Sequence, residues 1–171
     1  MKQSEIVPNK KNLWAPWRME YIKSPKQNSK ECIFCTKSKS DKDDENLIIF
    51  RGKYSFILLN LYPYNNGHTM VSSYEHNSEF HSLSQNTQLE MMQLSSQLMK
   101  IMKTEMNAEG FNFGANFGSV AGAGIKEHVH LHIVPRWEGD TNFMPVIGHT
   151  KVQVDGLKET HQYLKSFFNK K

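Results

Sequence analysis

Three histidines alternate with aliphatic residues in the segment HVHLHIV, residues 128–134. On a helix, residues two apart diverge by about 200°, so His128, His130 and His132 could not converge. On a strand they share one face, and the aliphatic residues bury the other, so we expect a strand that ends at Pro135. A row of imidazoles suits metal binding, or phosphate chemistry in which one ring attacks and its neighbours donate hydrogen bonds. The alternatives are a strand that is merely histidine-rich and a pH-sensitive surface.

The only two cysteines, Cys32 and Cys35, lie three positions apart in the segment ECIFC. A disulfide between thiols this close in sequence would not link distant segments of the chain, so a disulfide framework is excluded. They can hold one side of a tetrahedral zinc ion, form a redox pair, or remain free thiols. The choice among these depends on whether two further ligands exist.

A glycine-rich turn precedes the histidine segment. Gly118, Gly122 and Gly124 have no side chains, so backbone N–H groups there can approach an anion closely. An ordinary flexible hairpin is the alternative, but three histidines and Asn116 nearby favour phosphate binding. The sequence has neither a Walker-type lysine motif nor a dinucleotide fingerprint, so P-loop chemistry and a Rossmann fold are not supported.

The elements that must position these residues follow from the periodicity of the chain. LIIFRG, SFILLNLYPY and GHTMVSS predict an antiparallel meander, and GFNFGANFGSV predicts a strand that pairs with the histidine strand. Residues 84–106 predict a long helix with a core-facing apolar stripe. The stripe comprises Leu89, Met92, Leu94, Leu98, Met99, Ile101, Met102 and Met106. Residues 155–169 predict a C-terminal helix, and the charged stretch 36–46 predicts a flexible loop. The fold class is therefore α+β, with an antiparallel sheet, one long helix and a C-terminal helix.

Length and composition indicate one domain. The 171 residues are 38% hydrophobic and 22% charged, and we divide them into an N-terminal arm, 1–30, and a single domain, 31–171. The formal charge of +4 favours an anionic ligand without requiring nucleic acid. We expect a soluble, cytoplasmic protein because we see no signal-peptide core and no run of eighteen apolar residues. The arm contains NLWAPWRMEYI, which we expect to pack on the body or on a partner subunit.

The run from His128 to Val134 resembles the defining motif of the histidine triad family, in which three histidines alternate with hydrophobic residues and two hydrophobic residues follow. The flanking segments LLNLYPYNNGHTMV, GFNFGANFGSVAG, VPRWEGDTNF and NLWAPWRMEYI resemble its diadenosine tetraphosphate phosphorylase-like branch. The resemblance covers about residues 12–165 and also implies an α+β histidine triad fold.

The resemblance implies roles for individual residues. His130 would attack the α-phosphorus of a nucleoside phosphate and form a covalent nucleotidyl-histidine, with no metal required for the chemistry. His132 would bind phosphate oxygens or help to protonate the leaving group. His68 would lie beside the triad, or else be a satisfied structural histidine. The remaining implied substrate contacts are Asn60 to the ribose, and Asn116 with the backbone of Gly122, Gly124 and Ile125 to phosphate.

A structural zinc ion is also implied by the resemblance. Its ligands would be Cys32, Cys35, His76 and His128, which form the Cys2His2 set of a closed tetrahedral site. The alternative is a pair of free thiols and a surface His76.

The turn departs from the family pattern at one position. Near Gly124 many relatives carry a Ser or Thr hydroxyl that contacts the bridging phosphate oxygen, but here the turn reads Ala123-Gly124-Ile125. Ser119 is the candidate substitute, and the departure bears on turnover rate and leaving-group preference.

The function that we expect is a nucleotidyl hydrolase or transferase that cleaves dinucleoside polyphosphates such as diadenosine tetraphosphate. Resolution by phosphate gives ADP and ATP, resolution by water gives AMP first, and the flanking resemblance favours phosphorolysis. The alternatives are hydrolysis of nucleoside phosphoramidates, a low-turnover nucleotide sensor, and a zinc-dependent nucleic-acid module, which is weakest because no basic stripe with interleaved aromatics occurs. The expected partners are the nucleotide and a second copy of the chain in an edge-to-edge dimer, without nucleic acid or membrane.

Overall fold

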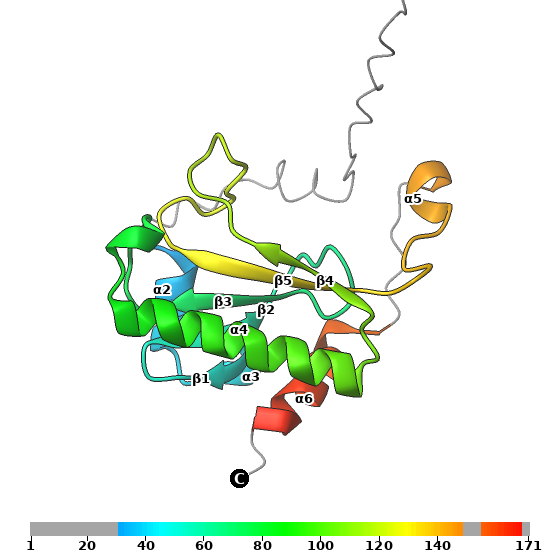
Figure 1. Cartoon of the computed structure of the whole chain (residues 1–171), viewed down its shortest axis with the longest axis horizontal. Coiled ribbons are helices and arrows are strands. Elements are labelled where there is room, and N and C mark those ends of the chain that lie inside the picture. Colours follow the sequence, from blue (N-terminus) through cyan, green and yellow to red (C-terminus); the bar gives the residue numbers. More distant parts are fainter. Residues whose placement is uncertain (1–30, 149–154, 169–171) are drawn as a thin grey trace, which may run out of the picture.

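The computed structural model describes residues 31–148 and 155–168, so the expected N-terminal arm lies outside the described residues. Figure 1 shows the described elements, which are, in chain order, α2 (Ile33–Lys39), α3 (Asp43–Asn46), β1 (Ile48–Arg51), β2 (Ser55–Leu59), β3 (Thr69–Ser73), η1 (Phe80–Ser82), α4 (Gln85–Glu105), β4 (Gly110–Gly114), β5 (His130–Arg136), α5 (Met144–Ile147) and α6 (Leu157–Phe168). Strands and helices are segregated along the chain, which confirms the α+β class.

The five strands form one antiparallel sheet in the order β1-β2-β3-β5-β4. This order confirms both the predicted meander and the pairing of β4 with the histidine strand. In the register, His130 lies opposite Ser72 of β3, and His132 lies between Met70 of β3 and Gly114 of β4. The catalytic candidates therefore lie on a central strand that is held on both sides.

The expectation that Pro135 ends the histidine strand is wrong. β5 continues to Arg136, and Pro135 lies opposite Phe111 of β4. The ladder between β3 and β5 stops at Ile133, so Pro135 occupies a stretch that is paired on one side only. A strand tolerates proline there because a missing N–H on the unpaired side breaks no ladder hydrogen bond.

The sheet separates two apolar clusters because successive side chains of a strand point to opposite faces. The larger cluster lies under α4, which crosses one face of the sheet in Figure 1, and it contains Leu131 and Ile133 of the histidine strand. The smaller cluster lies on the opposite face and comprises Phe34, Ile48, Phe56, Leu58 and Met70. The alternation of β5 directs His130 and His132 to this second face.

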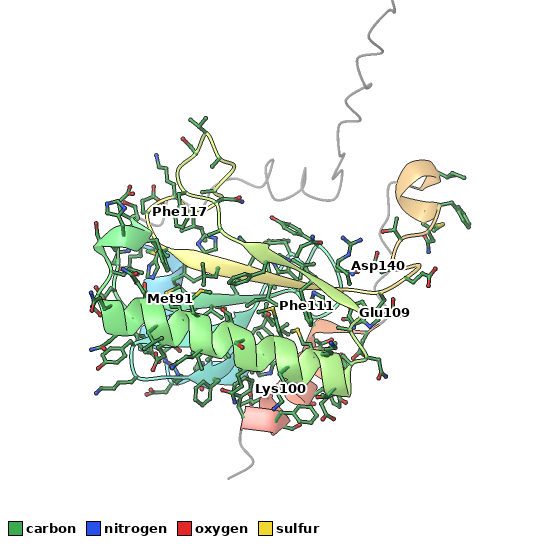
Figure 2. All side chains as sticks on the ribbon, in the orientation of Figure 1. Met91, Lys100, Glu109, Phe111, Phe117 and Asp140 are labelled. Carbon is green, nitrogen blue, oxygen red and sulfur yellow. The ribbon has the colours of Figure 1, made fainter. Side chains whose placement is uncertain are left out.

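The predicted long helix is confirmed as α4, and the Ser84 hydroxyl caps it by accepting the Thr87 N–H at 3.1 Å. Figure 2 shows Met91 and Phe111 between this helix and the sheet. The predicted stripe is confirmed at Leu94, Leu98 and Met102, which are buried. It is wrong at Leu89, which is 57% exposed, and at Met92, which is 46% exposed. The buried residues of α4 are Thr87, Met91, Leu94, Ser95, Leu98 and Met102.

The predicted flexible loop over residues 36–46 is wrong, because α2 extends to Lys39 and α3 begins at Asp43. Arg51 of β1 organises this segment. Its guanidinium donates to the carbonyl oxygens of Ser38 and Ser40, both at 2.6 Å, and forms an ion pair with Asp43 at 2.8 Å. A charged composition alone could not predict these tertiary contacts.

The predicted C-terminal helix is confirmed as α6, which packs against β1. Its buried His161 donates from Nε2 to the carbonyl oxygen of Ile48 at 2.8 Å, so this histidine is satisfied by the fold. Within the described residues, no helix is long and apolar enough to cross a membrane.

Glu90 of α4 holds the turn between β1 and β2. Its carboxylate accepts the backbone N–H groups of Lys53 at 2.9 Å and Tyr54 at 2.7 Å, and the Ser55 hydroxyl at 2.8 Å. Burial alone would raise the pKa of Glu90, but these donors outweigh it and lower the pKa below its usual value. The turn needs glycine at Gly52, because a Cβ there would lie 2.8 Å from the Glu90 carboxylate.

Replacing Glu90 by glutamine is expected to lower the free energy of unfolding by about 1–3 kcal/mol, because an amide group would face donors that need an acceptor. The folded-state pKa is lowered, so the carboxylate stabilises above its unfolded pKa of about 4.3 and loses this effect as pH falls through the folded value. Urea unfolding at several pH values should show a lower free energy of unfolding for Glu90→Gln than for wild type. This difference should be largest at neutral pH and should shrink in acid. Glu105→Gln, at the exposed end of the same helix, should show no such deficit, and a pH-independent loss in Glu90→Gln would contradict the assignment.

Candidate active site and metal centre

A backbone hydrogen bond fixes which ring nitrogen of His130 carries the proton. Its side chain is 5% exposed, and Nδ1 lies 2.8 Å from the carbonyl oxygen of His128. A carbonyl oxygen only accepts, so Nδ1 carries the proton of the neutral ring and Nε2 carries the lone pair. Burial lowers the pKa of His130, and the hydrogen bond to His128 offsets part of that effect. The geometry therefore suits a neutral imidazole that acts as a nucleophile through Nε2.

A chain of hydrogen bonds sets the opposite tautomer on His132. The Tyr64 backbone N–H donates to Nδ1 of His68 at 3.0 Å, so the proton of neutral His68 is on Nε2. That Nε2–H donates to Nδ1 of His132 at 2.9 Å, which leaves the His132 proton on its own Nε2. The rings of His130 and His132 are 4.9 Å apart between centroids. An acceptor nitrogen and a donor nitrogen thus lie side by side, as a nucleophile and a hydrogen-bond donor to phosphate require.

His68 itself is buried, with 0% exposure, behind His132. Asn60, the residue after β2, lies beside it: the Asn60 N–H donates to the His68 carbonyl oxygen at 2.9 Å, and the Asn60 side-chain oxygen accepts the Tyr62 N–H at 3.0 Å. The structure thus places two predicted substrate-binding residues near the histidine pair. His68 contacts His132 directly, and Asn60 contacts His68.

A second cluster joins Cys32, Cys35, His76 and His128, whose ligand atoms all lie within 4.8 Å of one another. Nδ1 of His128 is 3.3 Å from the sulfur of Cys32 and 3.6 Å from that of Cys35, and Nδ1 of His76 is 3.3 Å from the Cys35 sulfur. The segments involved are the start of α2, the loop after β3 and the approach to β5. The structure therefore assembles all four predicted metal ligands, which form a possible metal site.

The donor set fits a tetrahedral divalent ion. With metal–sulfur and metal–nitrogen bonds of about 2.3 and 2.0 Å, tetrahedral sulfur and nitrogen ligands lie about 3.5 Å apart, close to the distances found here. His128 donates from Nε2 to the Ser73 carbonyl oxygen at 2.9 Å, which directs the lone pair of Nδ1 to the thiols. Burial lowers the pKa of His128, and the Ser73 bond partly opposes this. The four residues can hold a structural zinc ion.

The other predicted phosphate contacts lie in and beside the hairpin between β4 and β5. Asn116 is half-buried two residues after β4, and Ile125 packs on the smaller apolar cluster. Gly118 and Gly122 have φ of 78° and 88°, which L side chains rarely adopt. The Gly122 N–H donates to the Ser119 carbonyl oxygen at 3.0 Å, so it is used inside the turn. Gly124 and Ser119 lie at its exposed surface.

Three residues of the site were not predicted from the sequence. Phe34 packs on the rings of His128 and His130, with centroid distances of 5.1 and 4.8 Å. Tyr64 supplies the first N–H of the His68 chain, and Ser73 orients His128 through its carbonyl oxygen. Only Phe34 could have been found from the sequence, because it lies between the two cysteines. Tyr64 and Ser73 act through backbone groups, which every residue type can supply.

Comparisons with known proteins agree with this geometry. The HIT domain model matches residues 41–139. The chain is 37% identical to "AP-4-A phosphorylase" of Mycobacterium tuberculosis over 89% of this chain and 81% of that protein. It is 26% identical to "Adenosine 5'-monophosphoramidase" of Saccharomyces cerevisiae over 78% of this chain and 80% of that protein.

A solved structure shares the fold. The "ZN-bound histidine triad family protein" of Mycobacterium smegmatis superposes with a TM-score of 0.63 at 22% identity, over 80% of this chain and 91% of that one. The family model spans more than half of the chain, and the mycobacterial relative is similar over most of it. The chain is therefore an enzyme of the histidine triad family.

Proposed function

We propose that this enzyme cleaves dinucleoside polyphosphates, with diadenosine tetraphosphate as the favoured substrate, through a covalent nucleotidyl-His130. The observation that carries the proposal is the fixed tautomer of His130, whose Nδ1–H is held by the His128 carbonyl oxygen so that Nε2 is the nucleophile. The relative named for AP-4-A phosphorolysis, at 37% identity, supports the choice of substrate.

In the first step Nε2 of His130 attacks the α-phosphorus, and the bond from phosphorus to the bridging oxygen breaks. The electron pair of that bond leaves on the oxygen of ATP, and the His130 ring becomes positively charged. The His128 carbonyl oxygen, 2.8 Å from Nδ1, stabilises this charge. His132 donates from Nε2 to a phosphate oxygen or to the departing oxygen.

In the second step an acceptor oxygen attacks the same phosphorus and His130 leaves. If the acceptor is inorganic phosphate, the products of the whole reaction are ADP and ATP. If it is water, they are AMP and ATP. The two outcomes use the same residues, and the mycobacterial relative supports phosphate as the acceptor.

We propose the substrate contacts that the family resemblance implies, adjusted for the burial and hydrogen bonds of each residue. Asn60 binds the ribose, while Asn116 and the amides of Gly124 and Ile125 bind phosphate oxygens; Gly122 joins them only if its bond to Ser119 opens. We assign His68 to orienting His132 instead of touching the substrate, because His68 is fully buried.

The leaving group has an open path over β4. Gly114 lies opposite His132, and a Cβ built on Gly114 would meet no atom within 4 Å. The described part of β4 therefore leaves space beside His132 where a polyphosphate can extend. A nucleoside phosphoramidate, the substrate class in the name of the yeast relative, needs less of this space and is the second candidate.

We propose that Cys32, Cys35, His76 and His128 hold zinc. Bound there, zinc would hold α2, the loop after β3 and the approach to β5 together, and it supplies no step of the reaction. We also propose a dimer in which the outer edge of β4 pairs with that of a second copy. β4 is an edge strand of the sheet and its Phe113 is exposed, so pairing would cover both.

Product analysis tests the function. Diadenosine tetraphosphate incubated with the pure enzyme and inorganic phosphate should yield ADP and ATP in equal amounts, with little product when phosphate is absent. AMP and ATP at a rate independent of phosphate would make the enzyme a hydrolase. No product from this substrate, with release of AMP from adenosine 5'-phosphoramidate, would favour the second candidate, and nucleotide binding without any product would favour a sensor.

A further inference from the structure

Phe34 joins the metal centre to the nucleophile. It lies between Cys32 and Cys35 in the first turn of α2, and its side chain is 0% exposed. Its ring centroid is 4.8 Å from that of His130, with an angle of 35° between the planes, and 5.1 Å from that of His128. One aromatic side chain therefore contacts both the nucleophile and a candidate metal ligand.

The position of Phe34 is fixed from two directions. On one side it belongs to the apolar cluster with Ile48, Phe56, Leu58 and Met70. On the other, the neighbouring thiols lie against His128, with Cys32 at 3.3 Å and Cys35 at 3.6 Å from its Nδ1. A metal ion bound by these thiols would hold the turn that carries Phe34. The position of the Phe34 ring against His130 would then depend on whether the metal is bound.

His130 needs such a restraint because the χ2 rotation of histidine is broad and has two near-equivalent orientations. A half-turn exchanges Nδ1 with Cδ2 and Nε2 with Cε1, and a carbon atom would then face the phosphorus. The hydrogen bond to the His128 carbonyl oxygen opposes this rotation at one point of the ring. Phe34 opposes it over the ring face, because the half-turn would sweep through the volume that its side chain fills.

We propose that Phe34 is a positioning residue: its ring holds the His130 imidazole in the orientation that presents Nε2, and it couples the Cys32–Cys35 turn to the nucleophile. This inference rests on the proposed function of His130. Phe34 takes no part in the bond changes, and its contribution is to the fraction of time that His130 spends in a reactive geometry.

The test compares two buried phenylalanines of the same cluster. Phe34→Leu keeps apolar volume but removes the ring face from His130, whereas Phe56→Leu makes the same change beside Tyr74, which Phe56 stacks upon at 5.3 Å. We expect Phe34→Leu to lower the single-turnover rate of adenylyl transfer to His130 by about tenfold or more. Its affinity for AMP should change less than twofold, and Phe56→Leu should retain the wild-type rate. Zinc content, measured on each purified variant, should be equal.

Two other outcomes would overturn the inference. Equal losses of rate in the two variants would mean that Phe34 acts only through general packing. A loss of AMP affinity in Phe34→Leu without a change of rate would make Phe34 part of the nucleoside pocket.

NMR of the wild-type protein keeps the inference testable if Phe34→Leu does not fold. Nuclear Overhauser contacts between the Phe34 ring and the carbon-bound protons of His130 are expected, together with a single set of His130 resonances, and absence of these contacts would refute it. Failure of the proposed function is a separate result, because wild type and Phe56→Leu would then also form no nucleotidyl-histidine.

Discussion

Replacing His130 by alanine is expected to lower the turnover of diadenosine tetraphosphate by about a thousandfold or more, and to abolish the covalent nucleotidyl-enzyme. Loss of a nucleophile removes the two-step path altogether, and the activity that remains comes from binding and electrostatic effects alone. The expected loss is this large because His130 combines a fixed Nδ1–H, at 2.8 Å from the His128 carbonyl oxygen, with a position beside His132.

The measurement is the rate of product formation, together with the mass of acid-quenched enzyme after brief exposure to the substrate. Wild type should gain one adenylyl group, located on His130 by peptide mapping. The matched control is His161→Gln. His161 is another buried histidine, on helix α6, and its ring also donates to a backbone carbonyl oxygen, that of Ile48 in β1. It should lose stability but keep the adduct. Normal turnover in His130→Ala, or an adduct on another residue in the wild type, would overturn the mechanism.

His132 should behave differently from His130 in the same assay, because their tautomers are opposite. In the proposed mechanism His132 donates from Nε2 while His130 attacks through Nε2. The difference originates in the Tyr64 N–H, which acts on His132 through His68. None of these relations is readable from HVHLHIV. Alternation predicted that the imidazoles share a face, but the proton on each ring depends on backbone groups that only the fold brings near.

The sheet could be predicted from sequence because its strands are short, apolar and separated by turn residues. Predictions failed where side chains from distant segments decide the local structure. The stretch 36–46 looks like a solvated loop, yet Arg51 of β1 binds the carbonyl oxygens of Ser38 and Ser40 and so stabilises the end of α2. The buried face of α4 was predicted only in part. Met91 and Met92 are chemically identical, and only the angle at which the helix packs on the sheet buries Met91 and exposes Met92.

The predicted metal ligands depend even more on contacts between segments that are distant in the sequence. Cys35 and His76 are 41 positions apart and Cys32 and His128 are 96 apart, so no local pattern could join them. The family resemblance proposed the four residues together. The structure supplies the physical reason: the order β1-β2-β3-β5-β4 puts the end of β3 beside the start of β5, next to the first turn of α2. Two predicted metal ligands, His76 and His128, come from those two strand ends.

The purified protein is expected to contain one zinc ion per chain, and its removal should lower the midpoint of thermal unfolding by about 10 °C. A ligand present at a thousand times its dissociation constant stabilises the folded state by about 4 kcal/mol, and each kcal/mol shifts the midpoint by about 2–4 °C in a chain of this size. Activity should fall too, because His128 is a candidate ligand through its ring and accepts the His130 Nδ1–H through its carbonyl oxygen.

His76→Gln tests the site with the least damage, because His76 is the exposed member of the four ligands. The variant should retain less zinc by elemental analysis and should unfold at the lower temperature even when zinc is supplied in modest excess. His81→Gln is the matched control: it changes a solvent-exposed histidine five positions further on, outside the cluster, and should keep full zinc content. Equal zinc content and equal stability in the two variants would remove His76 from the ligand set. A wild-type protein without zinc, unaffected by added zinc or chelator, would refute the site as a whole and leave Cys32 and Cys35 as free thiols.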